Sequence, residues 1–280
     1  MLKKCLKYDL RASFRLWLII SIAAISSSII LGLSIVGMEV CADIPILSLL
    51  SAFAMMPTFM IMIIYPAAVM LILCFRCYTS FFTDEGYLTF TLPVKRSTHL
   101  NSKIICMSVY MIATLVILLV SILIATSIAT FALESEGMLA QMFSEIGYAI
   151  SQIAGSGVFG ILILITVPIS AVAFGLFGIL FNHFCITFGS MLAKRMKLLA
   201  IIATFYVSEA IIGVISYIVF ILGMFAVTTF IVGALETVIM SNGIALVWLA
   251  ILATTSIVLI ISGLLYRYTL SLLERNLNLA

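Results

Sequence analysis

Long stretches without any charged residue constrain the fold of this 280-residue chain more than any other feature of its sequence. One of them runs from Ile104 to Leu133, and a helix needs only about 20 apolar residues to cross a bilayer. Hydrophobic residues make up 65% of the chain and charged residues 9%, against about 45–50% and about 25% in soluble domains. Too few polar residues are present to cover a water-soluble fold. The sequence therefore predicts an integral membrane protein.

The apolar stretches are continuous and do not show the short alternating pattern of membrane β-strands, so we predict an all-α fold. We expect one transmembrane domain that covers residues 1–280. Its six expected spans are residues 16–37, 49–75, 104–132, 158–182, 198–223 and 243–266. Ser97 is the expected N-cap of the helix that enters the third span.

Further structure is predicted outside these six spans. Leu2, Leu6, Leu10, Phe14 and Trp17 recur at helical spacing among basic residues, which predicts an amphipathic surface helix that leads into the first span. Between the third and fourth spans, apolar positions at helical spacing predict a short interfacial helix that covers residues 139–150. Residues 223–242 are expected to hold a re-entrant or interfacial piece, because the fifth apolar run is nearly twice as long as one span needs.

Glycines in and before the fourth span predict close packing between helices. We expect this role for Gly155, Gly157, Gly175 and Gly178, because small residues let the backbones of two membrane helices approach each other.

The distribution of basic residues predicts the orientation. All fourteen Lys and Arg residues fall in the N-terminal segment, the loops after the second and fourth spans, or the C-terminal tail. The other loops contain only acidic charges, such as Glu39, Asp43 and Glu134. Short loops rich in Lys and Arg stay in the cytoplasm. We therefore expect a multi-pass protein of the cell membrane with both termini in the cytoplasm.

The loop after the second span is the longest charged interruption, and its residues carry a family resemblance. It reads Phe82-Thr83-Asp84-Glu85-Gly86-Tyr87-Leu88, then Leu92-Pro93-Val94, then Leu100-Asn101-Ser102-Lys103 at the entry to the third span. This order of an acidic-Gly segment, a Leu-rich turn, a Pro-Val pair and a final Lys resembles bacterial ABC-2 type transporter permeases. The N-terminal sequence Lys7-Tyr8-Asp9-Leu10-Arg11 also resembles the surface helix of that family.

The resemblance implies that the chain is the membrane subunit of an ATP-driven exporter. In such exporters a short cytoplasmic helix between the second and third spans docks on a separate ATPase subunit. Here that coupling role would fall within the loop formed by residues 80–103. The expected coupling residues are Asp84, Glu85, Gly86, Tyr87, Leu88, Leu92 and Pro93. The carboxylates of Asp84 and Glu85 could pair with basic groups of the ATPase subunit. Tyr87, Leu88 and Leu92 could anchor the interface with it, and Pro93 would end the helix. A solvated loop at the lipid headgroups is the plainer interpretation of the same residues.

No Gly-x-x-x-x-Gly-Lys-Ser/Thr motif, whose amides and lysine would hold nucleotide phosphates, occurs in the sequence. This absence excludes the standard ATPase site on this chain, and the resemblance implies that ATP and Mg²⁺ are bound by the partner ATPase. We also expect no enzyme activity, catalytic residue, metal site or cofactor on this chain. The resemblance also implies a second permease, either another copy or a homologous chain. The lipid bilayer is the remaining expected partner, and nucleic acid is not one.

Glu209 is the most unusual single residue. It lies about twelve positions after Lys197, or roughly 18 Å along a helix, which places a carboxylate near the middle of the bilayer. It could contact substrate, relay protons or bind a second permease; equally, it could be a protonated acid hydrogen-bonded to a neighbouring Ser or Tyr.

Two other functions are consistent with parts of the sequence. A secondary transporter or channel would normally carry several intramembrane charges or an internal repeat, and the chain shows one such acid and no clear repeat. A membrane scaffold or sensor would need no transport pathway. The sequence does not identify a transported substrate.

Overall fold

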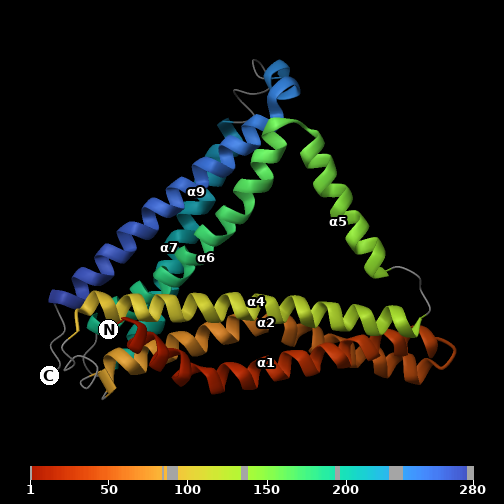
Figure 1. The fold of residues 1–280 in the computed structure, drawn as a ribbon, viewed down its shortest axis with the longest axis horizontal. Coiled ribbons are helices and arrows are strands. Elements are labelled where there is room, and N and C mark those ends of the chain that lie inside the picture. The colour runs from red at the N-terminus through yellow and green to blue at the C-terminus, as the bar shows by residue number, and fades with distance from the viewer. Residues whose placement is uncertain are drawn as a thin grey trace. The chain divides into compact units, whose positions relative to one another are not determined.

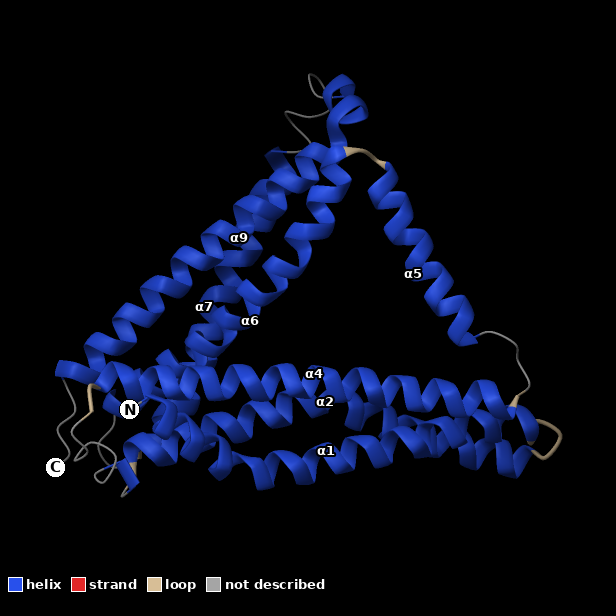
Figure 2. Cartoon of the chain, in the orientation of Figure 1, coloured by secondary structure: helices blue, strands red, loops and turns tan. Residues whose placement is uncertain are grey.

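The fold is known from a computed structural model, which describes residues 2–83, 85–86, 94–133, 138–192, 196–226 and 236–275. These residues form seven helices and no strand (Figure 2). In chain order the helices are α1 (Leu2–Val40), α2 (Pro45–Phe82), α4 (Arg96–Ala132), α5 (Met138–Gly155), α6 (Val158–Leu192), α7 (Lys197–Ala226) and α9 (Glu236–Arg275). The predicted all-α class is confirmed for this part of the chain.

Six of the helices are long and apolar enough to span a membrane, and each contains one of the predicted spans. They are longer than the predictions: α1 has 39 residues, which corresponds to about 58 Å at 1.5 Å per residue, whereas the hydrocarbon core is about 30 Å thick. The predicted N-terminal surface helix is the first part of α1, which continues without a break into the apolar stretch. The helices must therefore tilt or extend beyond the hydrocarbon.

The local sequence accounts for several helix boundaries. Pro45 stands in the first turn of α2, where its missing N–H is not needed. The predicted cap at Ser97 is wrong by two positions, because α4 begins at Arg96 with Lys95 as its N-cap. Gly157 joins α5 to α6 with a φ of 92°, a conformation that residues with a side chain rarely adopt.

The chain divides into two compact units, Met1–Tyr148 and Ala149–Ala280, and helix α5 includes the boundary between them. In the first unit α1 packs against both α2 and α4 (Figure 1). In the second unit α6 packs against both α7 and α9.

Small side chains bring α1 close to α4. A Cβ atom added to Gly32 would lie 2.9 Å from the carbonyl oxygen of Ala125 and 2.9 Å from the Cβ of Ile128. The buried residues of α1 are mostly Ser, Ala and Gly, and the hydroxyls of Ser27 and Ser34 donate to carbonyls of their own helix. These bonds satisfy the hydroxyls where water is scarce.

The close packing predicted at four glycines is not found within the described part of the chain. A Cβ atom on Gly155, Gly157, Gly175 or Gly178 would meet nothing within 4 Å. The close approach in the second unit lies further along α6, at Gly189, where an added Cβ would come within 2.6 Å of the Cα of Ile201 in α7.

Candidate functional site

The basic residues of the first unit lie at one end of its helices, which we call the charged end. This end combines the start of α1, the end of α2 and the start of α4, and the turn between α1 and α2 lies at the opposite end (Figure 1). The basic residues of the charged end are Lys3, Lys4, Lys7, Arg11, Arg15, Arg76, Lys95, Arg96 and Lys103. The opposite end carries Glu39 and Asp43. The first unit is therefore polarised along its helices.

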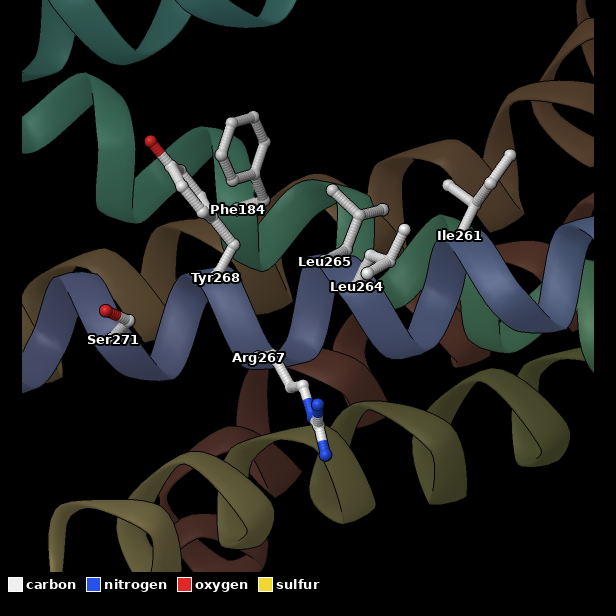
Figure 3. Close-up of a pocket in the computed structure, with 7 residues that line it drawn as sticks. All are labelled: Phe184, Ile261, Leu264, Leu265, Arg267, Tyr268 and Ser271. Atoms are coloured by element: carbon white, nitrogen blue, oxygen red, sulfur yellow. The ribbon is translucent and has the colours of Figure 1, made fainter.

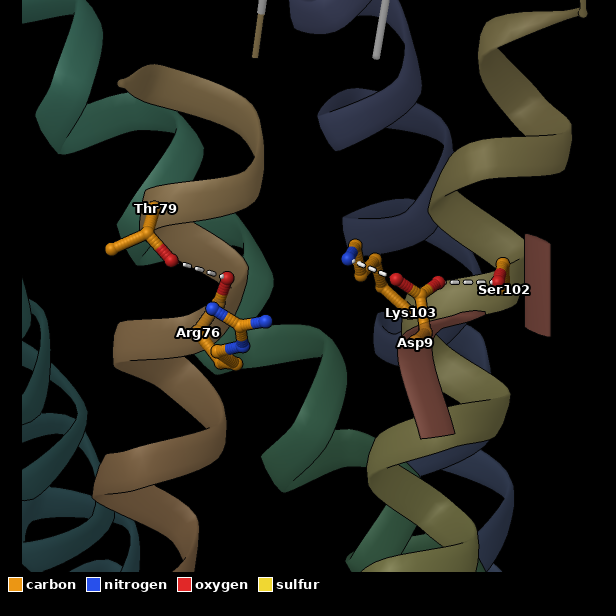
Figure 4. Close-up of polar contacts among 5 residues, drawn as sticks. All are labelled: Asp9, Arg76, Thr79, Ser102 and Lys103. Atoms are coloured by element: carbon orange, nitrogen blue, oxygen red, sulfur yellow. Dashed lines mark hydrogen bonds and ion pairs between the residues drawn. The ribbon is translucent and has the colours of Figure 1, made fainter. Parts of the chain in front are cut away.

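A cluster of three polar residues, the Asp9 cluster, joins α1 to α4 at the charged end. The Asp9 carboxylate forms an ion pair with the Lys103 ammonium and accepts a hydrogen bond of 2.5 Å from the Ser102 hydroxyl (Figure 4). The side chains of Lys103 and Asp9 are only 13% and 16% exposed. An ion pair with so little water around it depends strongly on both partners, because either charge alone would be poorly solvated.

The Asp9 cluster also contacts the end of α2. The Lys103 ammonium lies 5.7 Å from the centre of the Phe81 ring, within the range of a cation–π interaction. Phe81 is 1% exposed. Lys103 therefore interacts with residues of α1 and α2 from its place on α4.

Two further hydrogen bonds attach the first part of α1 to α4. The Tyr110 hydroxyl donates to the Leu10 carbonyl, and the Trp17 indole N–H donates to the Thr114 hydroxyl over 3.1 Å. Further along, the hydroxyls of Ser21 and Tyr65 are 2.9 Å apart and link α1 to α2. The first part of α1 is thus fixed to its neighbours by side chains.

The predicted coupling loop, residues 80–103, is shorter in the structure, because residues 80–82 belong to α2 and residues 96–103 to α4. The Gly86 N–H donates to the Thr83 carbonyl over 2.8 Å, and Gly86 is buried whereas Glu85 is exposed. A Cβ atom on Gly86 would lie 2.4 Å from the Phe81 carbonyl oxygen, so the turn requires glycine. One turn earlier, the Thr79 hydroxyl donates to the Arg76 carbonyl (Figure 4).

The remaining predicted coupling residues lie outside the described residues. They are Asp84, Tyr87, Leu88, Leu92 and Pro93. Among the described part of the site, the sequence prediction missed Asp9 and Phe81 as contacts of Lys103, and Ser102 as a contact of Asp9. A usable signal was present, since Asp9 is the one acidic residue among five basic ones in the first fifteen positions.

Glu209 is not part of this cluster. It lies on α7 in the second unit and is exposed. A hydrogen bond to a neighbouring Ser or Tyr, one of the alternatives considered for Glu209, is not found among the residues that the structure describes.

A groove in the second unit lies along α9, beside α6. The Phe184 and Tyr268 rings are 5.9 Å apart, and Ile261, Leu264 and Leu265 form an apolar wall (Figure 3). Its volume is about 540 Å³, and Arg267 and Ser271 complete the lining. In Figure 3 the Arg267 guanidinium extends from the side of α9 opposite to Phe184 and Tyr268, so the groove presents mainly apolar surface.

The second unit also gathers basic residues at one end. Gly189 of α6 meets Ile201 of α7, and Phe184 of α6 meets Tyr268 of α9. These contacts bring Lys197 and Arg267 to the same end of the unit. In each unit, these basic residues therefore lie at one end.

Comparisons of the chain with protein-family models, curated proteins and solved structures found no match. The class that the fold defines is a multi-pass helical membrane protein with six apolar helices long enough to span a bilayer.

Proposed function

We propose that the chain is the membrane-spanning permease subunit of an ATP-driven exporter of the ABC-2 type. The segment formed by residues 80–103 would dock on a separate ATPase subunit, which would bind ATP and Mg²⁺. A second permease would complete the transporter. Both termini and the charged ends would face the cytoplasm at the cell membrane.

The Asp9 cluster is the observation that carries this proposal. The resemblance to ABC-2 type permeases rests on two pieces of sequence, one around Asp9 and one ending at Lys103, which lie far apart in the chain. An ion pair joins these two pieces. Such a largely buried ion pair would not be expected between an ordinary surface loop and an ordinary basic terminus.

The contacts of Lys103 suggest how motion would pass from the loop to the membrane helices. A partner bound at the exposed Glu85 would move the short turn at Gly86, which packs on the backbone of Phe81. Phe81 and Asp9 both contact Lys103. The charged ends of α1, α2 and α4 would therefore move together when the loop moves.

The polarity of both units supports the cytoplasmic placement of the loop. Basic residues gather at the ends that hold residues 80–103, Lys197 and Arg267. Lys and Arg near the ends of membrane helices are retained on the cytoplasmic side. An ATPase subunit could reach the loop only from that side.

Reversing the charge of Glu85 tests the docking role. We expect Glu85→Lys to reduce the amount of ATPase subunit that co-purifies with the tagged full-length chain by about tenfold, because a repulsive charge at an interface disfavours the complex. The ATPase is recognised by its phosphate-binding motif in mass spectrometry and by ATP hydrolysis in the eluate.

Glu39→Lys is the matched control, since Glu39 is also exposed but lies at the opposite end of the first unit. It should leave co-purification unchanged. Equal recovery of the ATPase with both variants and the unmodified chain would contradict the docking role.

A further inference from the structure

A second groove lies at the charged end of the first unit, between the start of α1 and α4. Its volume is about 550 Å³. Its lining residues are Lys3, Leu6, Lys7, Leu10, Arg11, Phe14 and Tyr110. Six of these seven residues belong to the first four turns of α1, so the groove is built mainly by one amphipathic segment.

The lining combines a row of cations with a row of apolar side chains. Lys3, Lys7 and Arg11 follow one another at four-residue spacing and are exposed. Residues four apart lie on one side of a helix, so the three positive charges form a single row. Leu6, Leu10 and Phe14 are also spaced four residues apart. They form an apolar row beside the row of cations.

The acidic residue nearest in sequence does not neutralise this row. The Asp9 carboxylate is bound to Lys103 and Ser102 on α4. The Tyr110 hydroxyl donates to the Leu10 carbonyl, so this hydroxyl already has a partner within the protein. The groove therefore offers positive charge and apolar surface.

We propose that this groove binds an anionic phospholipid from the leaflet on the N-terminal side of the protein. The lipid phosphate would lie against Lys7 and Arg11, with Lys3 adding charge at the edge. One acyl chain would lie against Leu6, Leu10 and Phe14. The proposal depends on the membrane insertion of the helices and is independent of the exporter function.

Charge complementarity and position favour a lipid over other anions. A soluble phosphate would use the cations but would leave Leu6, Leu10 and Phe14 exposed to water. The same segment continues into the apolar part of α1 without a break, so the groove is next to the bilayer. Lys and Arg near a membrane surface attract anionic lipids, and apolar contact adds to this attraction.

Native mass spectrometry of the full-length chain in detergent tests the site, with phosphatidylglycerol and phosphatidylcholine as probes. We expect the first phosphatidylglycerol to bind more tightly than the first phosphatidylcholine. Lys7→Gln with Arg11→Gln should weaken that first binding about tenfold, and Phe14→Ala should weaken it severalfold through the lost acyl contact. Excess glycerol phosphate should not displace the lipid.

Lys4→Gln with Lys95→Gln is the control, because it removes the same charge from exposed positions of the same end outside the groove. It should retain at least half of the affinity. Equal losses in the two double variants, equal binding of the two lipids, or displacement by glycerol phosphate would each overturn the proposal. Unchanged thermal unfolding of Lys7→Gln with Arg11→Gln would show that its loss of lipid does not come from misfolding.

Discussion

Lys103→Met is expected to lower the free energy of unfolding of the first unit by about 3 kcal/mol. The substitution leaves the Asp9 carboxylate, which is only 16% exposed, without its cation, and the loss of one partner from a poorly hydrated ion pair costs about 3–5 kcal/mol. The cation–π contact with Phe81 is lost as well. Few single substitutions outside an apolar core should cost as much.

The two tryptophans allow this loss to be assigned to one unit. Trp17 contacts Thr114 and Tyr110 in the first unit, whereas Trp248 contacts Phe159 in the second. In a Trp248→Phe background, fluorescence during denaturant unfolding reports on the first unit. Adding Asp9→Asn to Lys103→Met should recover part of the loss, because no unpaired charge then remains.

Lys95→Met is the matched control, since Lys95 is exposed at the same end. It should change the free energy of unfolding by less than about 0.5 kcal/mol. If Lys103→Met and Lys95→Met cost the same, or if the losses from Asp9→Asn and Lys103→Met simply add, the Asp9 cluster does not hold the charged end together.

Gly189→Val is expected to be the most damaging substitution in the second unit, with a loss of about 3 kcal/mol. An added Cβ would come within 2.6 Å of the Cα and 2.9 Å of the amide nitrogen of Ile201. These are backbone atoms, so the whole of α7 must move away from α6. Overpacking of this kind typically costs about 1–3 kcal/mol, and the hydrogen bond from the Thr204 hydroxyl to the Cys185 carbonyl would be broken too.

Gly175→Val on the same helix is the comparison, because a Cβ at Gly175 meets nothing within 4 Å. Removing a glycine from a helix is otherwise slightly favourable, so this variant should be at least as stable as the parent. Unfolding is followed by Trp248 fluorescence in a Trp17→Phe background. Similar stabilities of the two variants would show that α6 and α7 do not meet closely at Gly189.

The sequence predicted the fold class and the existence of the six apolar helices, because about 20 uncharged apolar residues leave few alternatives to a spanning helix. Helix ends were harder to predict. The fourth span was expected to end at Asn182, yet α6 continues to Leu192. Apolarity indicates where a chain can enter lipid, whereas a helix can continue beyond the lipid as long as its backbone remains hydrogen-bonded.

The candidate site was only partly predictable. Lys103 was recognised as part of a motif, and the single acidic residue among five basic ones marked Asp9 as unusual. The two residues lie 94 positions apart, so no local pattern pairs them. The close packing predicted at four glycines was not found within the part of the chain that the structure describes, for a related reason. Gly175 and Gly178 lie on α6 like Gly189, but only the side of α6 that faces another helix requires a small residue, and that side is determined by the packing of the folded unit.

Photo-cross-linking from position 85 in living cells tests the proposed function most directly. A photoreactive amino acid replaces Glu85 in one variant and Glu39 in another, and mass spectrometry identifies the cross-linked proteins. We expect position 85 to capture a polypeptide with the Gly-x-x-x-x-Gly-Lys-Ser/Thr motif, and position 39 to capture none. If position 85 captures no such ATPase, or if position 39 captures it equally well, the loop does not couple this chain to an ATPase.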